Sequence, residues 1–536
     1  MAFTPTLPAC LKGNWTVAQK EAAGLAESLR ECFPRTADQP AVRLEQSDAK
    51  PSDDRRPLNV GIVLSGGQAP GGHNVIAGVL DFLQARHPGS RLFGFLNGPR
   101  GIINQSAMEI TPEKMAPFRN QGGFHMIASG RDKIESAEHL QKAAHTASVM
   151  QLDGLVVCGG DDSNTNAAVL AEYFLAHDIS TGVIGVPKTI DADLKNDDVP
   201  ISFGFDTASK VYSEMIGNIM IDAASAGKYY HFIRLMGRNA SHITLECALQ
   251  THPQAALICE EVASHEYTLS DVTEQLADMV VARSAAGKEY GVALVPEGII
   301  EHVPEVHVLI KELNELMAAS PEMAENPAAV AEKLTPASAK VFELLPASIR
   351  LELLLERDPH GNVQVARIET EKLLLRLVEA ELQKRRAAGS YSGKFQGLSH
   401  YFGYEGRCSM PTNFDATYCY SLGYAAGALI ASGQTGLMTS VANLERPTTD
   451  WTVGGTPFTG MMCMERRNGK LKPVIQKALV DLHGPVFKAF KQQRDKWAIV
   501  DCYRSPGPIQ FSDTGAYCAT QTLALEINNG KPISIH

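Results

Sequence analysis

A glycine-rich acidic turn, Gly159-Gly160-Asp161-Asp162-Ser163, carries residue types that suit phosphoryl transfer. It directly follows the apolar run Gly154–Cys158. Glycines let the backbone approach a ligand closely, and Ser163 can cap the helical pattern that follows. Two adjacent carboxylates repel each other, and a magnesium ion bridging phosphate oxygens would offset that repulsion. A turn with two solvated aspartates is the alternative interpretation, and this turn alone leaves both open.

Two further turns follow apolar runs in the same way. Ser65–Gly72 leads from Leu58–Leu64 into a helical pattern, so its N–H groups and the helix dipole can hold an anion. It matches neither a Walker A loop nor a G-x-G-x-x-G fingerprint, and alone it suits a structural turn equally well. Pro187–Asp193 places Lys188 near Asp191 and a second aspartate.

The third turn has the groups that a phosphoryl acceptor requires. A hydroxyl acceptor needs a base in line with the donor, and aspartate is a common choice. A lysine such as Lys188 can balance charge on the moving phosphoryl group. Alone, such a turn is more often solvated and structural. Because open α/β sheets bind ligands at the carboxyl ends of their strands, three such turns together predict a phosphate-handling site.

Arginine and glutamate residues that could bind a substrate occur in three other short stretches. Met236-Gly237-Arg238 closes an apolar run, and Tyr404-Glu405-Gly406-Arg407 lies further along the chain. The planar guanidinium group donates bidentate hydrogen bonds to phosphate, although a single arginine is more often a surface residue. Glu260-Glu261 follows the run Ala256–Ile258 and could bind sugar hydroxyls or face water.

The segments that must position these turns alternate between short apolar runs and helical patterns. Gly182–Val186 and Val292–Val295 are apolar throughout, and helical patterns such as Asn164–Ala176 separate most such runs. Strands of this kind with helices between them indicate parallel sheets covered on both faces. The sequence therefore predicts an α/β fold with two Rossmann-like parallel-sheet lobes, a helical insertion and N- and C-terminal extensions.

Composition limits the partners. Hydrophobic residues make up 44% and charged residues 20% of the chain, as in ordinary globular proteins. The net charge of −11 argues against nucleic acid, so any phosphate site must be a local basic pocket. No apolar run reaches the about 20 residues that span a bilayer, and no secretory signal is visible. Ten cysteines without a C-x-x-C pair suit a reducing compartment, so we expect a soluble cytoplasmic protein without a membrane partner.

An ordered series of motifs resembles the phosphofructokinase family and, within it, the long pyrophosphate-dependent branch. The resemblance runs from about Leu58 to Gly433. Its motifs are LSGGQAPGGHNVI, NQGGF followed by SGRDKIE, GGDDSNTNA, PKTIDADLKN, FGFDTASKVY, GKYYHFIRLMGR, LVPEGII and GYEGRCSMPTNFD. The resemblance implies a reversible, magnesium-dependent transfer of a phosphoryl group from pyrophosphate to O1 of fructose 6-phosphate, as in glycolysis and gluconeogenesis.

The resemblance also assigns roles by position. Asp191 resembles the general base that takes the proton from the 1-hydroxyl, and Asp161 resembles the residue that positions magnesium. The implied substrate-binding residues are Thr189, Ile190, Asp191, Lys228, Tyr229, Met236, Gly237, Arg238, Glu261, Tyr404, Glu405, Gly406 and Arg407. The implied pyrophosphate-binding residues are Gly66, Gly67, Arg131 and Lys188. Lys228 and Tyr229 resemble residues that reach into a neighbouring subunit's site, which implies a homodimer or larger assembly with shared active sites.

Asp162 and Lys188 bear on the choice of donor and, with Asp191 and Arg238, form the implied catalytic set. In ATP-using relatives a glycine stands at the position of Asp162 and leaves room for the α-phosphate of the nucleotide. An aspartate fills that volume with negative charge, so ATP meets both a clash and repulsion. Lys188 offers a fixed cation that compact pyrophosphate can use. Pyrophosphate is therefore the expected donor.

Two positions depart from the family pattern. Ala192 stands where glycine is usual, which is expected to narrow the backbone near Asp191, and His125 replaces a frequent aspartate. Neither change removes a catalytic group.

The length of 536 residues implies several domains. We place an N-terminal extension at 1–56, a donor-binding lobe at 57–202, a sugar-phosphate-binding lobe at 203–300, a helical insertion at 301–400, and a return to the lobes with a C-terminal extension at 401–536. Helices are expected at Thr16–Glu31 and near Val474–Arg494.

Other functions remain open. A catalytically silent regulatory subunit would have lost the charges of the T-I-D and G-G-D-D turns, and both are intact. An ATP-dependent sugar kinase is disfavoured by Asp162. A nucleotide or lipid kinase with a G-G-D-G-[ST] turn would not explain the M-G-R and Y-E-G-R stretches. A pure binding module would need neither a base nor a metal-binding carboxylate.

Overall fold

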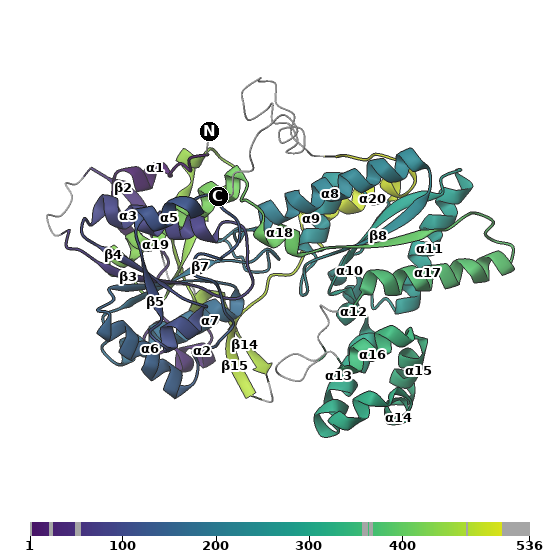
Figure 1. Ribbon diagram of the computed structural model, residues 1–536, viewed down its shortest axis with the longest axis horizontal. Coiled ribbons are helices and arrows are strands. Elements are labelled where there is room, and N and C mark those ends of the chain that lie inside the picture. The colour runs from purple at the N-terminus through teal and green to yellow at the C-terminus, as the bar shows by residue number, and fades with distance from the viewer. Residues whose placement is uncertain are drawn as a thin grey trace, which may run out of the picture.

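The computed structural model describes residues 3–20, 25–48, 55–355, 363, 368–467 and 470–505. Figure 1 shows two sheet-containing lobes side by side, with a separate group of helices beside the second lobe. The strands are β1 (Asn14–Gln19), β2 (Val42–Ser47), β3 (Asn59–Leu64), β4 (Arg91–Phe95), β5 (Ala107–Ile110), β6 (Gly154–Gly159), β7 (Gly182–Pro187), β8 (Tyr229–Leu235), β9 (Ala255–Ala256), β10 (Tyr290–Pro296), β11 (Gly397–Phe402), β12 (Leu437–Ala442), β13 (Thr452–Pro457), β14 (Met462–Arg467) and β15 (Lys470–Ile475).

The large sheet has a parallel centre and antiparallel edges. Its strand order is β1-β2-β13-β12-β7-β6-β3-β4-β5. Strands β12, β7, β6, β3 and β4 run parallel, whereas β13, β2, β1 and β5 extend the edges in antiparallel pairs. The carboxyl ends of β3, β6 and β7 therefore lie next to one another, and so do the turns that follow them.

The small sheet is entirely parallel, in the order β11-β8-β10-β9. Strands β8 and β10 end in register, and Glu297 N donates to Leu235 O at 2.9 Å just beyond them. This pairing places the turn Met236–Arg238 beside Glu297. Both sheets confirm the predicted α/β fold with parallel sheets in two lobes.

Helices cover both sheets and form the insertion. The helices are α1 (Ala9–Lys12), α2 (Glu27–Cys32), α3 (Gly72–Arg86), α4 (Pro99–Ile103), α5 (Pro112–Met115), η1 (Ala116–Phe118), α6 (Ala137–Val149), α7 (Asp161–Ala176), α8 (Phe205–Ala226), α9 (His242–Thr251), α10 (Cys259–Ser264), α11 (Leu269–Ala285), α12 (Ile299–His302), α13 (Pro304–Ala319), η2 (Pro321–Glu325), α14 (Pro327–Ala331), α15 (Pro336–Leu344), α16 (Ala347–Leu355), α17 (Thr370–Ala387), α18 (Tyr404–Cys408), α19 (Asn413–Ala431), η4 (Thr448–Asp450), η5 (Thr459–Met461) and α20 (Pro485–Ile499). In Figure 1, α13–α16 form the group beside the small-sheet lobe.

Helices α3 and α19 cross in close contact on the large sheet. A Cβ atom at Gly78 would lie 2.2 Å from Tyr420 O, and one at Gly423 would lie 2.1 Å from Val75 O. Only glycine permits such an approach of two backbones. The crossing matters to the site because α3 follows the glycine turn at Gly66, and α19 follows the short helix α18.

Two helices predicted in the extensions are helical in only part of their predicted ranges. Of the predicted helix Thr16–Glu31, the first part lies in β1, and only α2 is helical; residues 21–24 lie outside the described ranges. Strand β1 pairs with β2, whose buried Val42 and Leu44 join the core, so tertiary pairing overrides the local pattern. Of the predicted helix Val474–Arg494, the start belongs to β15, and α20 begins only at Pro485.

Within the described ranges, no helix combines the length and the apolar character needed to cross a bilayer. Most of the parallel strands are buried along almost their whole length, as their apolar sequences predict, whereas β11 at the edge of the small sheet is only partly buried. Val60, Ile62 and Ile184 have 0% exposed surface, and so do Phe232 and Leu294 in the small sheet. The turns at the strand ends therefore rest on rigid supports.

Candidate active site

The turns after β3, β6 and β7 form one cradle at the edge of the large sheet. Lys188 N donates to Gly159 O at 3.0 Å, and Ser163 Oγ donates to Ser65 Oγ at 2.8 Å. A side chain at Gly66 would meet Lys188 Nζ at 3.2 Å. The structure thus brings together the three turns that the sequence singled out.

Bare backbone at two glycines faces the cations of this cradle. Gly66 has a φ of +84°, which glycine adopts without strain. A Cβ at Gly67 would lie 2.4 Å from Arg407 Nη2 and 3.8 Å from Arg131 Nη2. Partial burial, followed by the charges of Arg238 and Arg407, lowers the pKa of Arg131. Neighbouring arginines repel one another unless an anion lies between them, so this cluster suits a phosphate group.

Lys188 is the buried cation of the cradle, with 5% of its surface exposed. Burial lowers its pKa to about 8, and the charges of Asp191 and Asp161 oppose that fall. The ammonium group is therefore still mainly protonated at pH 7. Because it is held by the protein rather than by water, its charge needs little rearrangement to stabilise a reacting anion.

Asp191 has the surroundings of a general base. Burial raises its pKa to about 6, and the charge of Glu297 adds to the rise, whereas Arg238, Lys477 and Lys188 oppose it. At pH 7 the carboxylate is ionised, yet it is a stronger base than an ordinary aspartate. Glu297, with 6% of its surface exposed, lies at the end of β10 and was not singled out from the sequence.

The turn around Asp191 is tightly held. Asp191 N donates to Thr189 Oγ1 at 3.1 Å, and Ile190 is buried. Ala192, at the usual glycine position, has a φ of +55° and is buried. Left-handed backbone costs alanine about 1 kcal/mol relative to glycine. The departure from the family pattern therefore places strain next to the proposed base. Burial also raises the pKa of Asp193 to about 7.

The turn Met236-Gly237-Arg238 connects the small sheet to this site. A Cβ at Gly298 would lie 1.9 Å from Arg238 O, so the backbones after β8 and β10 touch. Burial raises the pKa of Glu297, and the charge of Arg238 opposes the rise. Since Arg238 acts in the same way on Asp191, its guanidinium group lies near both carboxylates.

Helix α18 contributes one cation to the cradle. Arg407 Nη2 donates to Gln68 Oε1 at 2.8 Å, and its guanidinium group lies 5.4 Å from the centre of the Tyr404 ring. Glu405 Oε2 instead accepts from Gly403 N at 2.8 Å, which fixes the start of the helix. Tyr404 is 68% exposed, so Arg407 is the member of this stretch that faces the three turns.

Three further residues of the predicted substrate set lie elsewhere. Gly406 packs against α8, and Lys228 and Tyr229 lie at the amino end of β8. A Cβ at Gly406 would meet the Tyr212 ring at 2.5 Å, so this glycine allows α18 to pack on α8. Lys228 Nζ lies 5.0 Å from the centre of the Tyr229 ring, at the amino end of β8. A strand of seven residues is about 20 Å long, so this pair lies far from Arg238 at the carboxyl end.

Of the two adjacent glutamates, Glu261 points away from the Met236–Arg238 turn. Both of its carboxylate oxygens bind Arg494, at 2.6 and 2.9 Å. Glu260 Oε1 instead accepts from Ser241 N at 3.2 Å, just beyond the turn. Among the described residues, Glu260 Oε2 is buried without a hydrogen-bond partner. An unsatisfied buried acceptor is costly, and a sugar hydroxyl would satisfy it. The residue types alone did not distinguish the two glutamates, and the family resemblance pointed to Glu261.

Asp161 and Asp162 begin α7 and diverge. Lys477 Nζ lies 3.5 Å from Asp161 Oδ2, and Lys133 Nζ lies 3.8 Å from Asp162 Oδ1. The charge of Asp162 also opposes the lowered pKa of Arg131, so Asp162 lies near that arginine. Lys477 carried no local signal in the sequence, because it follows β15 in a segment predicted to be helical.

The acidic groups suit a magnesium ion that arrives with its phosphate ligand. No group of three or more His, Cys, Asp or Glu side chains in the described part of the chain is placed to hold a metal. Magnesium in phosphoryl-transfer sites usually takes one or two carboxylates and completes its shell with water and phosphate oxygens. Asp161, whose charge raises the pKa of Asp193, offers one such carboxylate.

Two relatives extend along nearly the whole chain. It is 55% identical to pyrophosphate–fructose 6-phosphate 1-phosphotransferase subunit beta 1 of Arabidopsis thaliana, over 98% of this chain and 93% of that protein. It is 48% identical to the pyrophosphate–fructose 6-phosphate 1-phosphotransferase of Porphyromonas gingivalis, over 99% of this chain and 98% of that protein.

A solved structure shares the fold. The pyrophosphate-dependent phosphofructokinase from Marinobacter aquaeolei superposes with a TM-score of 0.53 at 15% identity, covering 83% of this chain and 92% of that chain. The family model for phosphofructokinase matches residues 59–334. These matches, together with the cradle at the strand ends, lead to one conclusion: the chain belongs to the phosphofructokinase family.

Proposed function

We propose that the protein transfers a phosphoryl group reversibly from pyrophosphate to O1 of fructose 6-phosphate, giving fructose 1,6-bisphosphate and phosphate. The observation that carries the proposal is the meeting of Asp191, a half-buried base, with Lys188, a buried cation, at the glycine cradle. The names of the two relatives support the same donor and acceptor.

Each residue has a role in this reaction. Asp191 takes the proton from the 1-hydroxyl as O1 attacks the phosphorus atom of the donor. Lys188 and Arg131 balance charge on the transferring phosphoryl group, while the backbone of Gly66 and Gly67 binds pyrophosphate oxygens. Arg238 holds the acceptor beside the base. The positive charges of Lys188, Arg131 and Arg238 suit an anion that passes between these groups.

The remaining roles complete the two substrate sites. The turn Thr189–Asp191, the turn Met236–Arg238, Glu260 and Arg407 would bind the sugar phosphate, with Glu260 in place of the Glu261 that the family pattern suggested. Asp161 would hold a magnesium ion, which neutralises phosphate oxygens when bound.

The proposal also covers the oligomeric state of the protein and its cellular compartment. Lys228 and Tyr229 lie at the opposite end of β8 from Arg238, so they would serve the site of a second copy. We therefore propose a homodimer or larger assembly with shared sites, in the cytoplasm. The subunit name of the Arabidopsis relative is consistent with an oligomer.

Initial rates with pyrophosphate and with ATP, measured side by side on fructose 6-phosphate with magnesium, test the function. We expect turnover with pyrophosphate and little with ATP, because Asp162 opposes the nucleotide. The reverse reaction, from fructose 1,6-bisphosphate and phosphate, should be readily measurable. A chain that turns over neither donor would instead be a silent subunit, and preference for ATP would identify an ATP-dependent kinase.

The pH dependence of kcat/KM should be bell-shaped, with limbs near the two shifted pKa values. Asp191 must be ionised to accept a proton, so activity should rise as pH increases through about 6. Lys188 must be protonated, so activity should fall as pH increases through about 8. In Lys188→Arg the basic limb should move upward, because the guanidinium group stays charged. A wild-type profile that is flat from pH 5 to pH 9 would contradict both roles.

A further inference from the structure

The segment 476–484, which we call the strap, connects β15 to α20 and touches both lobes. On the large-sheet side, Ala478 N donates to Asp193 O at 2.7 Å, in the turn that carries the base. On the small-sheet side, Val480 N donates to Glu260 Oε1 at 2.9 Å. One short segment therefore crosses between the two proposed substrate sites.

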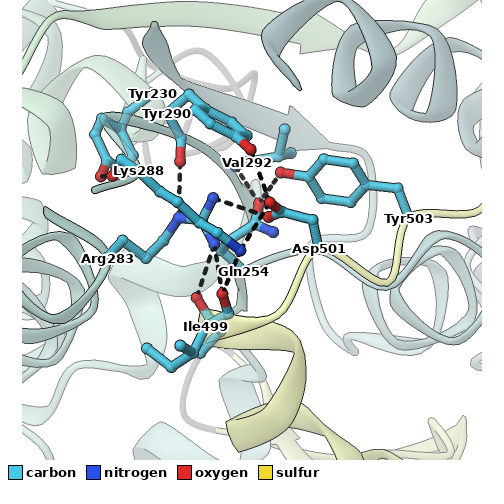
Figure 2. A network of polar contacts seen from close by, with 10 residues as sticks. Tyr230, Gln254, Arg283, Lys288, Tyr290, Val292, Ile499, Asp501 and Tyr503 are labelled. Atoms are coloured by element: carbon cyan, nitrogen blue, oxygen red, sulfur yellow. Dashed lines mark hydrogen bonds and ion pairs between the residues drawn. The ribbon is translucent and has the colours of Figure 1, made fainter. Parts of the chain in front are cut away.

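The elements on both sides of the strap are fixed. Before it, Ile475 N donates to Thr165 Oγ1 at 3.1 Å, on the helix α7 whose first residue is Asp161. After it comes α20, whose Arg494 binds Glu261. Just beyond α20, the fully buried Arg283 donates to Asp501 Oδ1 at 2.9 Å, and Figure 2 shows the polar network around this pair. A segment held at both ends and bonded to both lobes can place a side chain reproducibly.

Lys477 extends from the strap into the donor site. Its Nζ lies 3.5 Å from Asp161 Oδ2, and only 31% and 25% of the two side chains are exposed. Burial raises the pKa of Asp191 and of Asp193, and the charge of Lys477 opposes the rise for both. The ammonium group therefore lies close to three carboxylates at once.

A cation in this place favours an anionic donor. Pyrophosphate carries several negative charges, and the nearby carboxylates of Asp161, Asp162 and Asp191 repel it. Lys477 offsets part of that repulsion. Its ion pair with Asp161 also favours one orientation of the carboxylate, so less conformational freedom is lost when the donor binds.

We propose that Lys477 is a positioning residue of the donor site, which orients Asp161, offsets the acidic cluster and so tightens binding of magnesium pyrophosphate. This inference rests on the proposed function. It makes the strap, which lies in the C-terminal part of the chain, an element of the active site. Because Lys477 faces the carboxylates of the large-sheet lobe, its side chain should contribute little to binding of fructose 6-phosphate.

Isothermal titration of magnesium pyrophosphate into the full-length chain, without fructose 6-phosphate, tests the proposal. For Lys477→Met we expect the dissociation constant to rise about tenfold, the scale of one lost charge-assisted contact. Lys477→Arg keeps the charge and should restore most of the affinity. A separate titration with fructose 6-phosphate should give nearly the same constant for all these chains.

Lys472→Met is the matched control, because Lys472 lies on β15, five residues before Lys477, and pairs with Glu135 at 3.8 Å on the surface. It should bind pyrophosphate as the wild type does. Equal pyrophosphate affinity of Lys477→Met and the wild type would overturn the inference, and so would an equal loss for both substrates, which indicates a loosened strap. Absence of pyrophosphate turnover in the wild type, with binding intact, would contradict the proposed function alone.

Discussion

Replacing Asp191 by asparagine is expected to lower kcat by roughly 10²- to 10⁴-fold, the range that a positioned general base contributes. The amide has the size of the carboxylate but cannot take the proton from the acceptor hydroxyl. Burial and the charge of Glu297 hold the pKa of Asp191 at about 6, so the native group is both ionised and basic at pH 7. Steady-state rates with pyrophosphate and fructose 6-phosphate measure the loss.

Binding of fructose 6-phosphate by Asp191→Asn should change little, because the proposed contacts to the sugar phosphate from Arg238 and Arg407 are unchanged. Asp193→Asn is the matched control: it removes the other buried carboxylate of the same turn, whose pKa is raised to about 7. Its effect on kcat should be smaller. A larger loss in Asp193→Asn than in Asp191→Asn would show that the base had been assigned to the wrong aspartate.

Much of this site could be predicted because its information is local. The turns at Gly66, Asp161 and Lys188 each follow a short apolar strand, and parallel strands carry their following turns to one edge of the sheet. Strand, turn and helix are then specified within about 30 residues of sequence. Residue type and place in the turn were enough to point to an aspartate base in this turn, and the resemblance to the phosphofructokinase family assigned that role to Asp191.

The extensions were less predictable because their structure depends on distant partners. Strand β1 is stable as a strand because it pairs with β2, and β2 pairs with β13 through Arg43 and Gly454, more than 400 residues apart. The strap was predicted as helix for the same reason: its hydrogen bonds go to Asp193 and Glu260 rather than along its own chain. Lys477 could not be placed without those bonds.

The directions of the Glu260 and Glu261 side chains could not be predicted for a different physical reason. Adjacent residues in a helix project about 100° apart, so one glutamate of the pair must point elsewhere. Arg494 on α20 binds Glu261, and that helix is far away in sequence. Glu260 instead accepts a hydrogen bond from Ser241 N, three residues after Arg238. The identity of the residue types was predictable, but the direction of each side chain was not.

Replacing Asp162 and Lys188 together by glycine is expected to shift the donor from pyrophosphate toward ATP. The Asp162 side chain is 58% exposed at the start of α7, so glycine there removes volume and negative charge from the path of a nucleotide. Lys188 is a buried, fixed cation in the cradle. Losing it should lower the pyrophosphate rate by roughly 10²- to 10³-fold, as loss of one preorganised group in a transition state does.

The single variants separate the two effects. Asp162→Gly alone should admit some ATP and keep pyrophosphate turnover, because the cation remains. Lys188→Gly alone should lose pyrophosphate turnover without gaining ATP, because the aspartate still repels the nucleotide. Coupled assays at saturating fructose 6-phosphate, with thermal melting to confirm a folded chain, measure all three. If the double variant still fails to use ATP, neither the volume nor the charge of Asp162 excludes the nucleotide, and donor choice must arise from contacts elsewhere in the cradle.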